Sequence, residues 1–174
     1  MVLVLPQLEG QAEGGESSLD WQLWNRAIKA KKIVGGVETA TEQFSGMNNL
    51  PEKDQAELVR VSVEARIEAR RDNVEIGKDL VDLYLEGSGQ KLSQYFRASF
   101  KERKFSKSLT KKYRKGLVLE RNVRIAENID KAMKAHPDDV QFFAIGAAHY
   151  LNDRNVRYFL SRKGYVVTRA HDVK

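Results

Sequence analysis

A histidine closes an apolar run near the C-terminal end of the sequence. Residues 142–148 read FFAIGAA, and His149 follows them directly. An imidazole at the end of a buried strand could bind a metal ion or transfer a proton. It could equally be a half-buried side chain that is hydrogen-bonded to a neighbouring loop. Gly146 and the two alanines after it are small, so the backbone can turn tightly there and another group can approach closely.

A carboxylate occupies a similar place early in the chain. Glu38 follows the apolar segment 32–37 (KIVGGV), and Thr39 opens a predicted helix. One interpretation is a first-turn residue whose negative charge is stabilised by the helix dipole. The other is a metal ligand or general base. If both apolar segments are parallel strands of one sheet, Glu38 and His149 lie at the same sheet edge.

An amide interrupts the apolar face of the last long predicted helix. Asn122 has the spacing of the apolar residues on this helix, and Arg121 lies beside it. A buried amide without a hydrogen-bond partner costs about 1–3 kcal/mol, so Asn122 needs a partner. It could be a structural tie to a loop. Alternatively, Arg121 and Asn122 could orient Glu38 or His149, or bind a substrate carboxylate.

The elements that must position these residues predict an α/β fold. Apolar segments at 32–37, 140–145 and 165–168 are predicted strands, and residues 1–5 are β-like as well. The last two strands and the helix between them predict a βαβ unit, which is expected to be parallel and right-handed. The expected architecture is a small mixed sheet with this C-terminal βαβ unit and an inserted bundle of long helices.

The inserted helical region is predicted to span residues 51–135. Pro51 opens its first long helix, since proline is tolerated in a first turn. Along that helix, β-branched residues recur every four positions and predict a wide core-facing surface. These residues are Val59, Val63 and Ile67, and the surface is broadened by Leu58, Val61, Ala65 and Ala69. The last helix, from about 109 to 135, is expected to be loosened at Gly116.

The composition is that of an ordinary globular protein. The apolar fraction is 41% and the charged fraction 31%, and no internal repeat is evident, so residues 1–174 are expected to form a single domain. No stretch approaches the roughly 18 apolar residues of a membrane span. The absence of cysteine excludes disulfides, thiolate metal sites and cysteine nucleophiles.

The positive charge gathers in one segment. The net charge is +6, and residues 97–115 contain nine basic residues and one acidic residue. Aromatic residues are interleaved with or flank this segment: Tyr95, Phe96, Phe100, Phe105 and Tyr113. One interpretation is a surface for phosphates or anionic lipid. The other is a solvated pair of helices whose aromatic side chains face the core, and charge runs are more often of this kind.

Three motifs, in this order, resemble the TraB/GumN family, which includes the Tiki-type proteases. They are Gly36-x-Glu38-Thr39 with Gln43, the pair Arg121-Asn122, and Gly146-x-x-His149. The resemblance covers nearly the whole chain and implies an α/β fold in which two sheet halves face each other around a metal site. It also implies a metal-dependent peptidase that uses manganese, cobalt or zinc and acts on a peptide or protein substrate.

The resemblance assigns roles to residues of this chain. His149 would bind the metal, and Glu38 would be a second ligand or the base that activates water. The residues that support the site or bind substrate would be Arg121, Asn122, Gln43 and Gly146.

The sequence departs from the family in one motif. The family carries two Gly-x-x-His motifs, whereas this chain has only the one that ends at His149. Because catalytic zinc sites keep about three protein ligands, the chain is expected to be one ligand short. We therefore expect that an N-terminal segment is missing, that a second chain completes the site in a homo-oligomer, or that activity is lost.

Two functions other than catalysis stay open at this point. One is a non-catalytic module of the same fold that binds a peptide or a partner protein. The other is binding to an anionic membrane surface or to nucleic acid through the basic helix 97–115, of which nucleic acid is the less expected partner.

Overall fold

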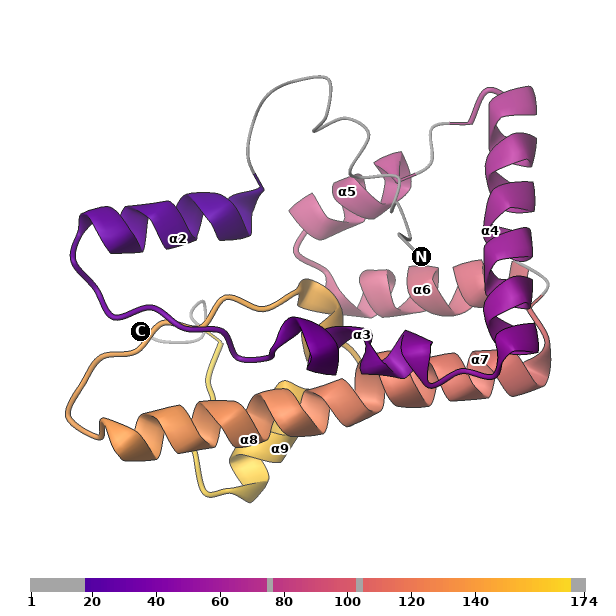
Figure 1. The fold of residues 1–174 in the computed structure, drawn as a ribbon. Helices are drawn as coiled ribbons and strands as arrows, with labels where there is room; N and C mark the ends of the chain where they lie inside the picture. Colours follow the sequence, from indigo (N-terminus) through magenta and orange to yellow (C-terminus); the bar gives the residue numbers. More distant parts are fainter. Residues whose placement is uncertain (1–17, 75–76, 103–104, 170–174) are drawn as a thin grey trace.

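The chain folds into helices joined by non-helical segments (Figure 1). This computed structural model describes residues 18–74, 77–102 and 105–169, so the β-like segment predicted at 1–5 lies outside it. The helices are α2 Leu19–Lys29, α3 Ala40–Asn48, α4 Glu52–Arg71, α5 Lys78–Leu85, α6 Gly89–Glu102, α7 Lys107–Arg114, the π-helical turn η2 Lys115–Leu119, α8 Glu120–Ala135, the 3-10 turn η3 Ala147–Tyr150 and α9 Val156–Arg162. None of the described helices is long and apolar enough to cross a membrane.

The predicted α/β sheet is wrong for the part of the chain that the structure describes. Segments 32–37, 140–145 and 165–168 are neither helix nor strand, and no backbone hydrogen bond joins any two of them. The predicted βαβ unit is therefore not formed either. Its helix, α9, instead packs along α8 (Figure 1).

The side chains of segment 140–145 show why the local pattern was misleading. Phe143 and Ile145 pack against the core, whereas Phe142 and Ala144, which alternate with them, are exposed, as is Val140. This alternation is typical of a strand, and β-branched and aromatic residues favour it. A strand of a sheet also needs a second segment about 4.8 Å away, and the local pattern does not specify that partner.

The main core lies between α8 and α9. Ile125, Ala126 and Ile129 of α8 and Val156 of α9 are buried there. Partly buried hydrophobic residues pack against this cluster: Val37, Met133, Phe143, Ile145, Phe159 and Leu160. The segments that precede Glu38 and His149 are thus both anchored on α8.

The predicted loosening at Gly116 is confirmed as the π-helical turn η2, which joins α7 and α8 into one long helix (Figure 1). Helix α3 crosses this turn through a contact between two glycines. A Cβ added to Gly46 would lie only 2.7 Å from the backbone carbonyl of Gly116. The close approach brings the segment around Glu38 next to the start of α8.

We predict that Gly46→Ala lowers the free energy of unfolding by about 1–3 kcal/mol, because its Cβ would collide with backbone atoms that cannot move aside. Gly35→Ala is the matched control, since a Cβ there meets nothing within 4 Å. The control is expected to be neutral or stabilising by less than about 1 kcal/mol. Urea unfolding measures both variants, and equal losses would contradict the glycine contact.

A second, smaller core joins α4 to α7. It contains Leu50, Leu58 and Leu109, with Phe105 and Tyr113 packed against it. The expectation that aromatic residues of the basic segment face the core is therefore confirmed for these two.

The predicted wide core-facing surface of α4 is confirmed for Leu58 and Val61 and wrong for its β-branched row. Leu58 and Val61 are buried, whereas Val59, Val63 and Ile67 are 38%, 51% and 61% exposed. The apolar stripe on this helix is broad enough for either side to face the core. The position of α7 decides which side is used, because Leu58 packs with Leu109.

Asp130 on α8 fixes the chain that follows α9. The Tyr165 hydroxyl donates a hydrogen bond to its Oδ1 at 2.8 Å, and Lys163 Nζ lies 3.2 Å from its Oδ2. Lys134 Nζ lies 3.0 Å from Oδ1. These partners, Tyr165 foremost, lower the pKa of Asp130 from 3.8 to about 2.

We predict that the carboxylate of Asp130 makes the free energy of unfolding depend on pH in the acidic range. Its pKa is lower in the folded than in the unfolded chain, so its contribution is complete above about pH 4 and is lost as the pH falls toward about 2. Asp130→Asn does not titrate, so the gap in unfolding free energy between wild type and variant should narrow between pH 4 and pH 2. A gap that stays constant in urea titrations across this range would refute the assignment.

Candidate functional site

Glu38 is held by a buried ion pair with the first turn of α8. Arg121 Nε lies 3.2 Å from Oε1 and 3.1 Å from Oε2 of Glu38, and Arg121 Nη2 donates to Oε2 at 2.8 Å. The Glu38 side chain is only 7% exposed. Both carboxylate oxygens are therefore engaged by a guanidinium, as a buried negative charge requires.

The backbone on both sides of Glu38 is fixed by side chains. Asn128 Nδ2 donates to the carbonyl of Val37 at 2.8 Å. After Glu38, the side chain of Thr39 accepts from the backbone N–H of Glu42 and the Glu42 carboxylate accepts from the backbone N–H of Thr39. This capping box satisfies free N–H groups at the start of α3 and sets the point where the helix begins.

Arg124 belongs to the same site and was not identified in the sequence. Its Nη2 donates to the Glu42 carbonyl at 2.9 Å and lies 3.7 Å from Oε1 of Glu38. Its Nε is buried without a hydrogen-bond partner in the described part of the chain. Two guanidiniums thus face one carboxylate. The signal was the three-residue spacing from Arg121, which puts both arginines on one helix face.

Asn122 lies between His149 and the loop before α9. It is 1% exposed, and its Nδ2 donates to the carbonyl of Arg154 at 2.8 Å. Its Oδ1 lies 2.7 Å from Nδ1 of His149, which is 7% exposed. Both the nitrogen and the oxygen of the Asn122 amide, which interrupts the apolar face of this helix, therefore have hydrogen-bond partners.

This arrangement defines the tautomer of His149. A carbonyl only accepts, so Asn122 must turn its amide nitrogen to Arg154 and its oxygen to the imidazole. Nδ1 of His149 then carries the hydrogen, and Nε2 carries the free lone pair when the ring is neutral. Nε2 has no hydrogen-bond partner among the described residues.

The surroundings also favour the neutral ring. Burial lowers the pKa of His149 below its usual 6.5, the charge of Arg121 lowers it further, and the charge of Glu38 opposes these effects. A neutral imidazole with a free Nε2 is the form that binds a metal ion. The two charged side chains lie close enough to His149 to act on its ring.

The Gly-x-x-His spacing corresponds to one turn of 3-10 helix. The His149 N–H donates to the carbonyl of Gly146 at 3.0 Å, which closes the turn. Since such a turn joins residue i to i+3, the spacing places the histidine over the residue that starts the turn. A Cβ on Gly146 would lie 3.9 Å from Cδ2 of His149, so Gly146 borders the ring.

The structure brings Glu38, Arg121, Asn122 and His149 to the first turn of α8. The prediction that Glu38 and His149 meet at a shared sheet edge is wrong. Each of them instead bonds to a residue of α8, Arg121 and Asn122 respectively. Gln43 is apart from this group: it is exposed on α3, and no side-chain hydrogen bond or ion pair links it to these described residues. His136 is likewise exposed.

A metal ion is only partly matched by these residues. His149 Nε2 suits one coordination position, but Glu38 faces Arg121 with both oxygens. The described residues contain no group of three or more His, Cys, Asp or Glu side chains that could hold a metal. They therefore provide a single ready ligand.

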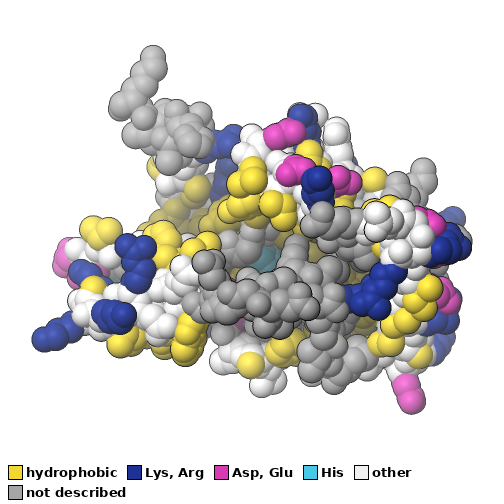
Figure 2. All heavy atoms as spheres, turned by 90° about the horizontal axis from the view of Figure 1, so that it is seen from above, with side chains coloured by type: hydrophobic (Ala, Val, Ile, Leu, Met, Phe, Trp, Pro, Cys, Tyr) yellow, Lys and Arg dark blue, Asp and Glu magenta, His cyan; other side chains and the backbone are white. Residues whose placement is uncertain are grey.

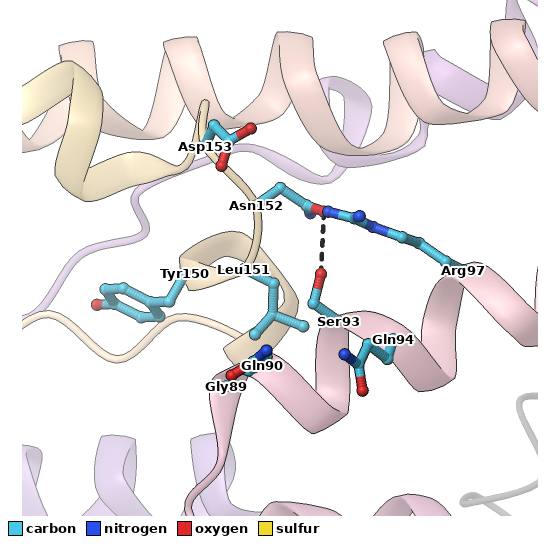
Figure 3. A pocket seen from close by; sticks show the side chains of 9 residues that line it. All are labelled: Gly89, Gln90, Ser93, Gln94, Arg97, Tyr150, Leu151, Asn152 and Asp153. Atoms are coloured by element: carbon cyan, nitrogen blue, oxygen red, sulfur yellow. Dashed lines mark hydrogen bonds between the residues drawn. The ribbon is translucent and has the colours of Figure 1, made fainter.

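A polar hollow of about 370 Å³ lies between α6 and the residues that follow His149, and it was not foreseen in the sequence (Figure 3). Its walls are the first half of α6 and the residues that follow His149. The lining residues are Gly89, Gln90, Ser93, Gln94, Arg97, Tyr150, Leu151, Asn152 and Asp153. Ser93 and Asn152 connect the walls with a 3.3 Å hydrogen bond across 59 residues of sequence. Only the packing of α6 creates this hollow.

A buried histidine beside an arginine–glutamate pair agrees with the motifs of one family. The profile of the TraB/PrgY/gumN family matches residues 1–169. The chain therefore belongs to the TraB/PrgY/gumN family, and the predicted family is confirmed.

Within this family the chain is similar to proteins named as TIKI metalloproteases. It is 26% identical over 163 residues to the Metalloprotease TIKI homolog of Nematostella vectensis, across 86% of this chain and 35% of that relative. It is 25% identical over 170 residues to Metalloprotease TIKI1 of Homo sapiens, across 90% of this chain and 34% of that relative. The chain thus spans about a third of the length of these relatives. No solved structure matches it.

Proposed function

We propose that this chain contributes His149 as a metal ligand to a metal-dependent peptidase. The observation that carries the proposal is the Nδ1–H to Asn122 hydrogen bond, which leaves the Nε2 lone pair free on a neutral ring. Metal-binding histidines usually donate their other N–H to an oxygen in this way. The relatives' names, which call them metalloproteases, support a bound metal ion. Manganese, cobalt and zinc are the candidates that the family resemblance implies.

At least one further ligand would come from outside the described residues. A catalytic zinc site keeps about three protein ligands, and His149 supplies one. Glu38 stays a prediction as second ligand or general base, and in either role its carboxylate would have to leave Arg121. Arg121 would then be available to bind a substrate carboxylate.

The chemistry of such a site follows from its parts. His149 would hold a divalent ion, which when bound would supply Lewis-acid chemistry toward a peptide carbonyl and a water. Asn122 fixes the ring of His149 and keeps its proton on Nδ1. The charge of Arg121 lowers the pKa of His149 in addition to the effect of burial, which disfavours protonation of the ring.

The polar hollow lined by Tyr150, the residue after His149, is the proposed place for the peptide substrate. Its amide side chains, Gln90, Gln94 and Asn152, both donate and accept hydrogen bonds, as the backbone of an extended peptide requires. Arg97 adds one positive charge at its edge (Figure 3). The volume is that of a site for a few residues rather than for a folded protein.

Metal titration tests the proposal. Chain purified without a histidine tag is titrated with Mn²⁺, Co²⁺ and Zn²⁺ by calorimetry, and Co²⁺ is also followed by visible absorption. We predict that His149→Ala weakens binding at least about tenfold, because it removes the only ready ligand among the described residues.

The matched control is His136→Ala. This histidine is exposed, with 57% of its side chain accessible, and is expected to leave metal affinity unchanged. Equal losses in the two variants, or equal affinity in wild type and His149→Ala, would refute the role of His149.

A separate observation supports a second function, a non-catalytic module that binds a peptide. Both oxygens of Glu38 are bonded to Arg121, so the pair can serve as structure alone. In that case a peptide should bind at the polar hollow with the same affinity in wild type and His149→Ala, with and without added metal. Metal-dependent peptide binding would support the peptidase instead.

A further inference from the structure

Helix α4 presents an apolar row to solvent instead of to the core. Ala56, Val59, Val63 and Ile67 are all exposed, with Val63 51% and Ile67 61% accessible. Their spacing of three or four residues places them along one face of a 20-residue helix. Exposed hydrophobic side chains are also visible among charged ones on the face seen in Figure 2. An exposed helix face is normally polar, so a continuous apolar row indicates a contact surface.

The other face of α4 holds the helix to the rest of the chain. Leu58 packs with Leu109 of α7, and Asp54 pairs with Lys112. The Glu57 carboxylate accepts hydrogen bonds from the backbone N–H and hydroxyl of Ser106. Figure 1 shows α4 at one edge of the molecule. Its exposed row is thus carried by a helix that is already fixed in place.

The two ends of the row carry opposite charges. Glu52 lies in the first turn of α4 and Arg70 in the last turn. Both are exposed, and neither has an ion-pair partner among the described residues. Since 3.6 residues make one turn, both side chains lie in the same stripe as Val59 and Val63.

We propose that α4 is a self-association surface through which two copies of this chain pair with antiparallel helices. If Val59 of one copy lies opposite Val63 of the other, the twofold axis passes at the level of Val61, which is midway between them in sequence. Position 61 is also midway between Glu52 and Arg70, so in this register Glu52 of each copy lies opposite Arg70 of the other. A parallel pair would instead oppose like charges. The same patch serves both copies, as a twofold dimer requires.

The contact is small and the dimer is accordingly weak. A helix of this length extends about 30 Å, and a single pair of such helices buries less than the roughly 1,200 Å² of a stable interface. We expect a dissociation constant on the order of 10–100 µM. The proposal is independent of the peptidase function, since none of these residues contacts His149 or Glu38.

Sedimentation equilibrium of the 174-residue chain at low salt tests the proposal. The average mass should rise from 19.8 kDa toward twice that value between about 1 and 500 µM. Val63→Glu should raise the dissociation constant at least about tenfold, because it brings two negative charges together near the axis. Val81→Glu on α5 is the matched control, since Val81 is 49% exposed, and it should leave the mass curve unchanged.

Charge reversal tests the antiparallel register. Glu52→Arg alone and Arg70→Glu alone should each weaken the dimer about three- to tenfold, because each opposes like charges at both ends. The combined variant reverses both pairs and should restore wild-type association. Circular dichroism and urea unfolding are measured alongside, since both changes also oppose the helix dipole.

Three results would overturn the proposal. They are a chain that stays monomeric at all concentrations, equal association in wild type and Val63→Glu, and a combined variant no stronger than the single ones. With the last result alone, dimerisation would stand but the antiparallel α4 pairing would not.

Discussion

Replacing Glu38 by glutamine is expected to lower the free energy of unfolding by about 3 kcal/mol. The change keeps the shape of the side chain but leaves the Arg121 guanidinium without its counter-charge. Removing one partner of a buried ion pair costs about 3–5 kcal/mol. The lower end applies because 18% of the Arg121 side chain is accessible to water. Urea unfolding at neutral pH measures the loss.

An exposed ion pair on α4 provides the control. Arg60 and Glu64 are 60% and 54% exposed, so Glu64→Gln should cost less than about 1 kcal/mol. A second arm combines Glu38→Gln with Arg121→Met, which removes the uncompensated charge and should recover part of the loss. If Glu38→Gln costs no more than Glu64→Gln, the buried pair does not contribute to stability in the way proposed.

Asn122→Leu is expected to cost about 2–4 kcal/mol. It removes the hydrogen-bond partner of the buried Nδ1–H of His149, which costs about 1–3 kcal/mol, and it also removes the half-buried hydrogen bond to the carbonyl of Arg154. The same change frees the imidazole from its fixed tautomer. Nitrogen NMR of His149 should therefore show its proton moving partly from Nδ1 to Nε2, and metal affinity should fall with it.

Asn128→Leu on the same helix is the control that separates the loss of stability from the change in the His149 tautomer. Asn128 donates one hydrogen bond, to the carbonyl of Val37, so its loss should cost about 1–2 kcal/mol. It does not contact His149, whose tautomer and metal affinity should stay unchanged. A His149 tautomer that is the same in wild type and Asn122→Leu would show that Asn122 does not position the ring.

The sequence identified most of the site, although by a different route from the one the structure uses. Glu38, Arg121, Asn122 and His149 were selected by residue type and position, and the structure brings them to one turn of α8. Asn122 was identified by a physical requirement, since a buried amide must be paired. Arg124 and the hollow against α6 were missed because each depends on a contact distant in sequence.

The prediction of α4 shows the same limit. The row Val59, Val63 and Ile67 was predicted to share one wide core-facing surface with Leu58 and Val61, but only the side with Leu58 and Val61 is buried. The periodicity of a helix reveals that an apolar face exists. Which face becomes core depends on where the neighbouring helix lies, and α7 takes the side of Leu58.

The sequence by itself determined local properties: the helices of residues 51–135, the loosened turn at Gly116, and a buried amide and a buried histidine that must find partners. These follow from backbone propensities and from the cost of desolvating a polar group, which act over a few residues. Only the tertiary structure decided that α8, rather than a sheet edge, joins Glu38 to His149, and that one face of α4 remains exposed. The physical reason is that strand pairing and helix packing depend on which distant segments meet, and a local pattern fits several partners equally well.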